Sequence, residues 1–158
     1  MRRRRVLTGA LAAVALAGCG SRPPTDGPGT SPSPAGTGTA LVGSEFRVRS
    51  SECGRQVDAA SVSFDPAAPA VAVNGTVWGP DTCHTARLAG ATYAPDADRL
   101  DVRVVAARRE TTGTPACAQC IVEVAYAATC AFAGGLPGRV RVVHGRGERE
   151  RVVTTAER

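Results

Sequence analysis

The stretch Leu100-Asp101-Val102-Arg103-Val104-Val105-Ala106 decides the fold class of this chain. Successive side chains of a β-strand point to opposite faces, so the even-numbered positions form an apolar face while Asp101 and Arg103 lie on the other. This alternation is typical of an antiparallel strand with one buried face and one solvated face. Similar alternation recurs along the chain, and no stretch convincingly follows the helical period of about 3.6 residues. The sequence therefore predicts an all-β protein.

About eight short strands are predicted, separated by turns rich in Pro, Gly and Asp. They are Glu45–Arg49, Ala60–Asp65, Ala70–Gly79, Thr85–Tyr93, Arg99–Arg108, Gln119–Phe132, Arg139–His144 and Arg149–Thr154. Strands of this number and spacing favour an antiparallel immunoglobulin-like sandwich, and a small Greek-key barrel is the alternative.

Three residues interrupt the strand pattern. Gly75 and Gly90 lie inside predicted strands, and we interpret both as β-bulges. Trp78 is out of phase with the valines of its strand. Two interpretations of Trp78 stay open: a contact residue on the outer face of the sheet, or a packing residue under a loop at the end of the strand.

The first residues predict export. Arg2–Arg5 precede an apolar run, Val6–Leu16, that is shorter than the roughly 20 residues needed to span a bilayer as a helix. We interpret residues 1–18 as a lipoprotein signal peptide. It ends in Leu16-Ala17-Gly18-Cys19, which looks like a lipobox, so Cys19 is the predicted lipidation site. The expected location is the outer face of the cell membrane, held there by the lipid.

Residues 19–40 are rich in Pro, Gly, Ser and Thr and have few side chains able to bury apolar area. Such a composition predicts a disordered tether. The remaining residues, 41–158, contain no second linker and no internal repeat, so they are expected to form a single domain.

The composition limits both the core and the partners. Hydrophobic residues make up 43% of the chain and aromatic residues only 4%, which predicts a core of Val, Ala and Leu. Four of the nineteen basic residues are Arg2–Arg5, which leaves fifteen against fourteen acidic residues. Because the exported part is nearly neutral, the sequence predicts no nucleic-acid partner. The expected partners are the membrane, through Cys19, and an envelope protein or polymer.

Five cysteines follow Cys19. Alternating strands would bring four of them, Cys53, Cys83, Cys117 and Cys120, to one end of the domain, which permits two disulfides. Three pairings are possible. We favour a bridge from Cys53 into the Cys117/Cys120 pair, with Cys83 taking the other member. Cys130 falls in the buried phase of its strand and is expected to be a free buried thiol.

The same end of the domain supports a second hypothesis, an envelope metal-handling or thiol-redox protein. Its residues are Cys83, His84, Cys117, Cys120 and His144. Two observations count against it. A strand, not a helix, follows the Cys117-Ala118-Gln119-Cys120 motif, and the ligand spacing is unlike that of structural zinc sites.

Nothing in the sequence indicates catalysis. It contains no Gly-x-Ser-x-Gly elbow and no phosphate-binding glycine loop. We therefore expect no catalytic residue, no resident metal and no cofactor. The leading hypothesis is a non-enzymatic binding or scaffolding module.

Several motifs together resemble a known group of proteins. They are the lipobox, the Thr/Pro/Gly tether, Cys53-Gly54, the Cys83 turn leading into Thr85-Ala86-Arg87-Leu88, the strand Leu100–Val104, and Cys117-Ala118-Gln119-Cys120 followed by Gly135-Leu136-Pro137. In these features the chain resembles uncharacterised exported lipoproteins of halophilic archaea. The resemblance implies a lipid-anchored, disulfide-bearing β domain at the cell surface. It carries over no activity and no catalytic residues.

Overall fold

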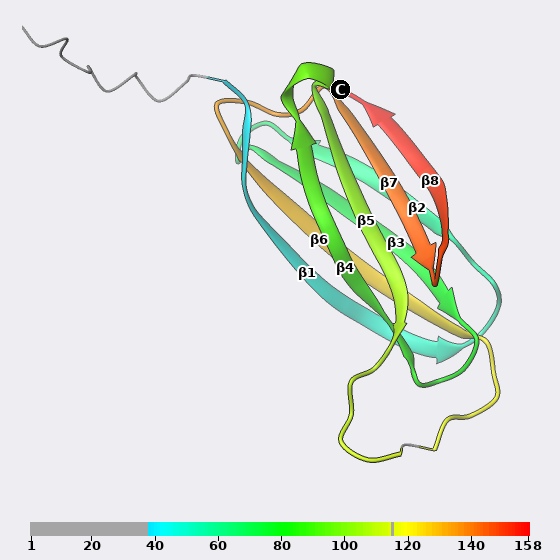
Figure 1. Cartoon of the computed structure of the whole chain (residues 1–158). Coiled ribbons are helices and arrows are strands. Elements are labelled where there is room, and N and C mark those ends of the chain that lie inside the picture. The colour runs from blue at the N-terminus through cyan, green and yellow to red at the C-terminus, as the bar shows by residue number, and fades with distance from the viewer. Residues whose placement is uncertain (1–37, 115) are drawn as a thin grey trace, which may run out of the picture. The chain divides into compact units, whose positions relative to one another are not determined.

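The computed structural model describes residues 38–114 and 116–158 (Figure 1). The predicted signal peptide, the lipidation site Cys19 and almost all of the predicted tether lie outside the described residues. Among the residues described, no helix is long and apolar enough to cross a membrane.

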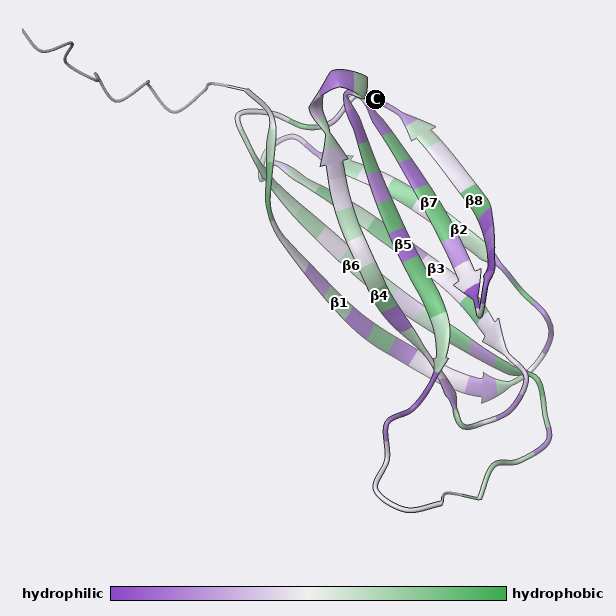
Figure 2. Ribbon diagram, in the orientation of Figure 1, coloured by the Kyte–Doolittle hydropathy of each residue, from purple (hydrophilic) through white to green (hydrophobic). Residues whose placement is uncertain are grey.

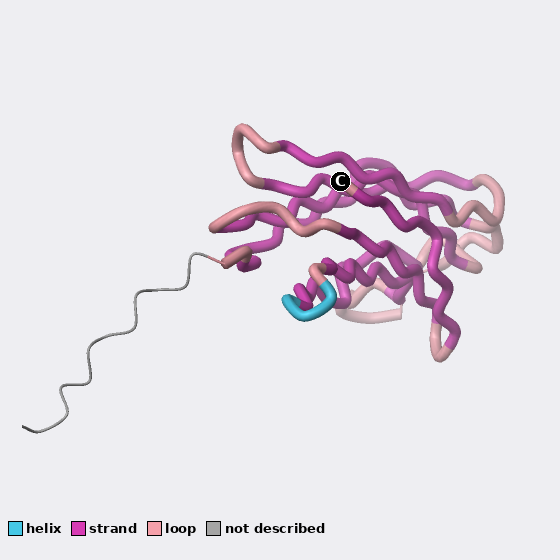
Figure 3. The backbone as a smooth tube through the Cα atoms, turned by 90° about the horizontal axis from the view of Figure 1, so that it is seen from above, coloured by secondary structure: helices cyan, strands magenta, loops and turns pink. Residues whose placement is uncertain are grey.

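The described chain folds as a sandwich of two four-stranded sheets. Sheet I has the order β1-β6-β3-β2 and sheet II the order β4-β5-β7-β8. Sheet I consists of β1 (Ala40–Cys53), β2 (Ala59–Asp65), β3 (Ala70–Gly79) and β6 (Val122–Ala133). Sheet II consists of β4 (His84–Ala94), β5 (Arg99–Arg108), β7 (Arg139–Arg146) and β8 (Arg149–Glu157), with a 3-10 turn η1 (Pro95–Ala97) between β4 and β5. The all-β prediction and the choice of a sandwich over a closed barrel are confirmed (Figures 1 and 3).

One strand pair differs from the antiparallel expectation. β5 and β7 are neighbours in sheet II and run parallel, with Arg99 opposite Arg139 and Val105 opposite Gly145. The reason is that the chain leaves sheet II after β5, returns along sheet I as β6, and enters sheet II again in the direction of β5. The expectation of a wholly antiparallel sandwich is wrong at this pair. The immunoglobulin-like topology is not confirmed, because the strand order differs from the A-B-E-D and C-F-G sheets of that fold.

The core lies between the inner faces of the two sheets and is built largely from valine. Buried side chains alternate with less buried ones over most of the length of β3, β5, β6 and β7 (Figure 2). The valines with no exposed surface are Val71, Val73, Val77, Val102, Val104, Val140 and Val142. Burying each such side chain stabilises the fold by about 1.5–3 kcal/mol relative to leaving it in water.

The strand boundaries show where the alternation of apolar and polar residues was enough to predict a strand. The bounds of β3 and β5 agree with the prediction, whereas β1 extends well beyond Glu45–Arg49 in both directions. β1 is an edge strand with irregular pairing near Leu41 and again near Val48, so its side chains do not alternate regularly. A sequence period of two cannot detect such a strand in full.

The two strand glycines have different roles. Gly90 lies at a register shift between β4 and β5, which confirms the bulge. Gly75 pairs directly with Tyr126 and has no register shift on either side, so its interpretation as a bulge is wrong. The ring of Tyr126 passes over Gly75, where a Cβ atom would collide with the tyrosine hydroxyl and lie 2.8 Å from the carbonyl oxygen of Ala59. Glycine is needed here for this close approach.

Candidate functional site

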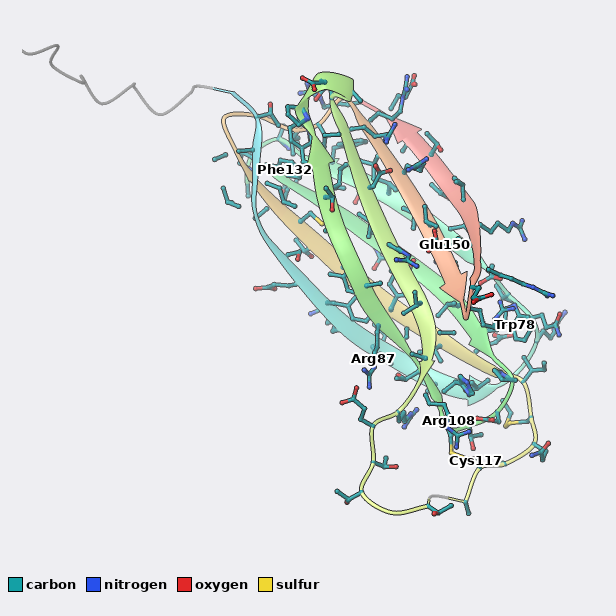
Figure 4. The ribbon with its side chains drawn as sticks, viewed as in Figure 1. Trp78, Arg87, Arg108, Cys117, Phe132 and Glu150 are labelled. Atoms are coloured by element: carbon teal, nitrogen blue, oxygen red, sulfur yellow. A yellow bond between two sulfur atoms is a disulfide. The ribbon has the colours of Figure 1, made fainter. Side chains whose placement is uncertain are left out.

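Two disulfides close one end of the sandwich. Cys53, at the end of β1, is bonded to Cys120, and Cys83, before β4, is bonded to Cys117. The Cα atoms are 5.7 and 5.3 Å apart, within the usual range for disulfides. This is one of the two pairings that the sequence favoured, and the sequence left open which member of the Cys117/Cys120 pair joins Cys53. Together the bridges fix the long β5–β6 loop, in which Figure 4 labels Cys117, to both sheets.

Among the described cysteines, Cys130 is the one outside a disulfide, and it is completely buried in β6. Burial in this apolar surrounding raises the pKa of its thiol to about 11. The thiol is therefore protonated at neutral pH and shielded from solvent, as expected for a packing residue.

The structure brings together some of the residues of the metal and redox hypothesis and places His144 elsewhere. Cys83, Cys117 and Cys120 are engaged in disulfides, and His84 Nδ1 lies 2.7 Å from Asp81 Oδ1. One oxygen of Asp81 and the sulfurs of Cys83 and Cys117 lie within 4.8 Å of one another. The hydrogen bond from His84 holds the pKa of the Asp81 carboxyl below its usual value. His144 does not join this group.

His144 instead lies between the sheets and is only 4% exposed. Its Nε2 atom is 2.7 Å from the hydroxyl of Tyr126 on β6, and its Nδ1 atom is 3.1 Å from Oδ1 of Asp58 in the β1–β2 connection. A carboxylate only accepts, so Nδ1 carries the proton donated to Asp58 and Nε2 accepts the tyrosine proton. Both ring nitrogens are thus engaged while the imidazole is neutral.

The surroundings of His144 favour that neutral form. Burial is the largest influence and lowers the pKa of the imidazole, because a charged ring loses its hydration. The Asp58 carboxylate acts in the opposite direction, while the nearby positive charges of Arg146 and Arg151 lower the pKa further. The net shift is downward from the ordinary value of 6.5.

Asp58 connects this buried group to an arginine on the surface. Its second oxygen, Oδ2, accepts a hydrogen bond of 3.2 Å from Arg146 at the end of β7. The Arg146 guanidinium lies over the ring of Trp78, with Cζ 3.4 Å from the ring centroid, and its Nε donates to the Trp78 carbonyl at 3.3 Å. A cation–π contact and two hydrogen bonds therefore hold the Arg146 side chain in place, and the cation–π contact also orients the Trp78 ring. Trp78 lies at the end of β3 and is partly exposed, so it has features of both interpretations left open by the sequence.

A tight hairpin brings two more arginines to the same place. Gly147 begins the two-residue turn between β7 and β8 with a φ of 57°, as glycine commonly does at the first position of a type II′ turn. The turn places Arg149 opposite Arg146, and Arg151 opposite His144. Arg149 and Arg151 are both exposed.

These residues surround a cleft of about 480 Å³. Its lining consists of Gln56, Asp58, Trp78, His144, Gly145, Arg146, Arg149, Glu150 and Arg151. Figure 4 labels Trp78 and Glu150, which lie at this corner beside the β7–β8 turn. In Figure 1 the β7–β8 turn and the end of β3 lie toward the opposite end of the sandwich from the start of β1. We refer to the hollow bounded by these nine residues as the arginine cleft.

Sequence reasoning did not identify the arginine cleft, although part of the signal was present. His144 is in phase with the buried Val140 and Val142, and Tyr126 lies in the buried phase of β6. A histidine at a strand position that faces the core needs a polar partner for its ring nitrogens. Asp58, by contrast, lies in a connection between strands, where no period indicates which way its side chain points.

The chain matches no family model, no curated protein and no solved structure. The function is therefore argued from the chemistry of the arginine cleft and of the disulfide-bonded end.

Proposed function

We propose that this protein is an exported binding module, anchored by a lipid at Cys19, that holds a component of the cell envelope in the arginine cleft. The two disulfides indicate an oxidising, extracytoplasmic location. The proposal also treats the sandwich as a rigid platform that presents a binding site near one end, as immunoglobulin-like domains do. That last element is an analogy at the level of fold.

The observation that carries the proposal is the pre-formed geometry of the cleft. A continuous set of contacts runs from Tyr126 through His144, Asp58 and Arg146 to Trp78. Tyr126 and His144 are buried, whereas Asp58, Arg146 and Trp78 are partly exposed. A polar recognition surface whose side chains are already fixed loses little conformational entropy on binding.

The position of the cleft also supports the proposal. The described chain enters the domain at the start of β1, and the cleft lies toward the opposite end (Figure 1). The end at which the chain enters the domain therefore does not cover the arginine cleft.

The buried part of the contact set supports binding over catalysis. The hydroxyl of Tyr126 is enclosed between Gly75 and His144, and burial raises the pKa of this tyrosine further above its ordinary value of 10.0. A phenol in this environment stays protonated. Since both nitrogens of His144 are engaged within the protein, the group acts to hold Asp58 and Arg146 in position.

A steric block of the cleft tests the proposal. Gln56→Tyr places a ring at the cleft wall without changing any charge, and Gln119→Tyr makes the same change in the exposed β5–β6 loop, outside the cleft. The measurement is co-sedimentation of residues 38–158, which contain both sheets and both disulfides, with purified envelopes of the source organism. We expect wild type and Q119Y to bind alike and Q56Y to bind at least about tenfold more weakly. Equal binding of Q56Y, or no binding by wild type, would contradict the proposal.

A second candidate function rests on the group formed by Asp81, Cys83 and Cys117, with His84 beside it. Reduction of the Cys83–Cys117 bridge by a dithiol such as dithiothreitol takes two electrons and two protons and leaves two thiols. Loss of the thiol protons would then let both sulfurs and Asp81 bind Zn²⁺. This candidate predicts that mild dithiothreitol opens this bridge before Cys53–Cys120 and that one zinc ion binds afterwards. Simultaneous reduction of both bridges, or no zinc uptake, would eliminate it.

A further inference from the structure

The charges of the arginine cleft are unequally neutralised. Of its two acidic residues, Asp58 is engaged by His144 and Arg146, and Glu150 on β8 is paired with Arg103 on β5, across the intervening strand β7. Among the described residues, no carboxylate lies within ion-pair distance of Arg149 or Arg151. The cleft therefore has two guanidinium groups with unused hydrogen-bond donors.

The hairpin register makes these two groups act together. Arg149 and Arg151 are two positions apart on β8, so they extend from the same face of the strand. That is also the face on which Arg146 and His144 lie across the hairpin, because directly paired residues share a face. Two like charges held side by side without a counter-charge repel each other, and an anion between them relieves that repulsion.

We infer that the arginine cleft binds an anionic glycopolymer of the envelope, with Arg149 and Arg151 donating hydrogen bonds to its carboxylate or phosphate oxygens. The inference rests on the proposed function and names the ligand class for the same site. A guanidinium presents a planar set of N–H donors that matches the two oxygens of either group, and such charge-assisted pairs are stronger than neutral hydrogen bonds.

Two observations favour a glycopolymer over other anions. Trp78 lines the cleft and is partly exposed, so the part of its indole that the Arg146 guanidinium leaves uncovered can contact the C–H face of a sugar ring. The volume of about 480 Å³ falls in the range of small-ligand sites and has room for a short stretch of sugar units.

The single tryptophan of the chain supplies a local probe, since Trp78 itself lines the cleft. Four probes are titrated into the isolated domain, with binding measured by calorimetry and by Trp78 emission: trigalacturonate, inorganic phosphate, the uncharged trisaccharide maltotriose, and a short polyglutamate. Binding of trigalacturonate would identify the ligand as a polymer with carboxylate sugars, and binding of inorganic phosphate would identify it as a phosphate-bearing polymer. We expect one or both of these to bind and maltotriose not to bind.

Paired charge variants test the named contacts. R149Q/R151Q removes two charges of the cleft. The control R47Q/R49Q removes two exposed charges from the edge strand β1, outside the cleft. We expect R149Q/R151Q to weaken binding of the anionic probe by at least about tenfold, with R47Q/R49Q close to wild type. Added salt should weaken wild-type binding and leave the residual binding of R149Q/R151Q nearly unchanged.

Several outcomes would overturn the inference: no anionic probe binds, maltotriose binds equally well, polyglutamate alone binds, or the two double variants lose affinity equally. The envelope assay separates this failure from failure of the proposed function. If Q56Y abolishes envelope binding while R149Q/R151Q does not, the cleft is a binding site but its ligand is not held by these arginines. If Q56Y binds envelopes like wild type, the proposed function itself is wrong.

Discussion

The hydroxyl of Tyr126 lies 2.7 Å from Nε2 of His144 and joins the two sheets through the middle of the core. Tyr126 belongs to β6 in sheet I and His144 to β7 in sheet II. Both side chains are buried, so this hydrogen bond forms where water cannot replace it. The aromatic ring of Tyr126 also stacks on Phe46 of β1, with the ring centroids 5.4 Å apart.

Removing the tyrosine hydroxyl should destabilise the domain. Tyr126→Phe leaves Nε2 of His144 buried without a partner, and we expect a loss of about 1–3 kcal/mol in the free energy of unfolding. Tyr93→Phe is the matched control, because the Tyr93 hydroxyl bonds the more exposed Asp98 at 2.7 Å. Urea unfolding of both variants checks this. Equal losses in the two variants would show that the buried hydrogen bond contributes no more to the free energy of unfolding than the exposed one.

Gly75 should be intolerant of even one added methyl group. Gly75→Ala places a Cβ against the Tyr126 hydroxyl and the Ala59 carbonyl oxygen, and overpacking of this kind costs about 1–3 kcal/mol. Gly90→Ala serves as the control, since no atom lies within 4 Å of the corresponding Cβ position. We expect G90A to change stability by less than about 0.5 kcal/mol. Thermal unfolding of the two variants tests this. Equal unfolding midpoints would refute the interpretation that the close approach of Tyr126 requires glycine at position 75.

The lowered pKa of His144 makes stability depend on pH in a defined direction. Between the folded pKa and the ordinary value of 6.5, the unfolded chain binds more protons than the folded one, so the free energy of unfolding rises with pH in that window and levels off above it. Asp58, Tyr126, Arg146 and Arg151 face the imidazole.

Comparison with His144→Gln isolates this contribution. As the pH falls from about 7 to about 5, wild type should lose more stability than H144Q, because H144Q has no imidazole to protonate. Urea unfolding at several pH values measures the difference. Parallel curves for the two proteins would mean that the histidine is not held neutral in the fold.

The two disulfides should stabilise the domain unequally. Cys53–Cys120 spans 67 residues and Cys83–Cys117 spans 34, and the longer loop loses more freedom when it is closed in the unfolded chain. The loop-entropy picture gives about 4 kcal/mol for each bridge taken alone, with the longer one favoured by about 0.5 kcal/mol. Denaturant unfolding of C53A/C120A and C83A/C117A tests the order. A larger loss in C83A/C117A would contradict the entropic account.

Most of the fold could be predicted from alternation alone. Residues such as Val102 and Val104 are buried on a regular strand, and their phase and charge pattern identify the strand without further information. The parallel pairing of β5 with β7 could not be predicted, because period-two alternation indicates which face is buried and not which strand lies beside it. The edge strand β1 was underestimated for the physical reason that its bulges break the alternation.

The candidate site was predicted less well than the fold. The gathering of four cysteines at one end followed from the rule that alternating strands return to the same end, and the structure shows two disulfides there. Which of Cys117 and Cys120 joins Cys53 was left open by the sequence. The arginine cleft depends on Asp58, which lies in a loop, and on Trp78, which reaches its position from the end of a strand. Neither placement is encoded in a local period. The sequence signals for the site were the buried phase of His144 and Tyr126 and the glycine turn between Arg146 and Arg149.

Chemical-shift mapping of the ¹⁵N-labelled domain, titrated with anionic glycopolymer released from the envelope, tests the central claim most directly. The chain has one tryptophan, so a single indole N–H resonance reports on Trp78. The account predicts that this resonance and the amides of Gly145, Arg149 and Arg151 show the largest shifts. Shifts centred on the loop around Cys117, or no shifts at a saturating concentration of polymer, would contradict the claim that the arginine cleft is the binding site.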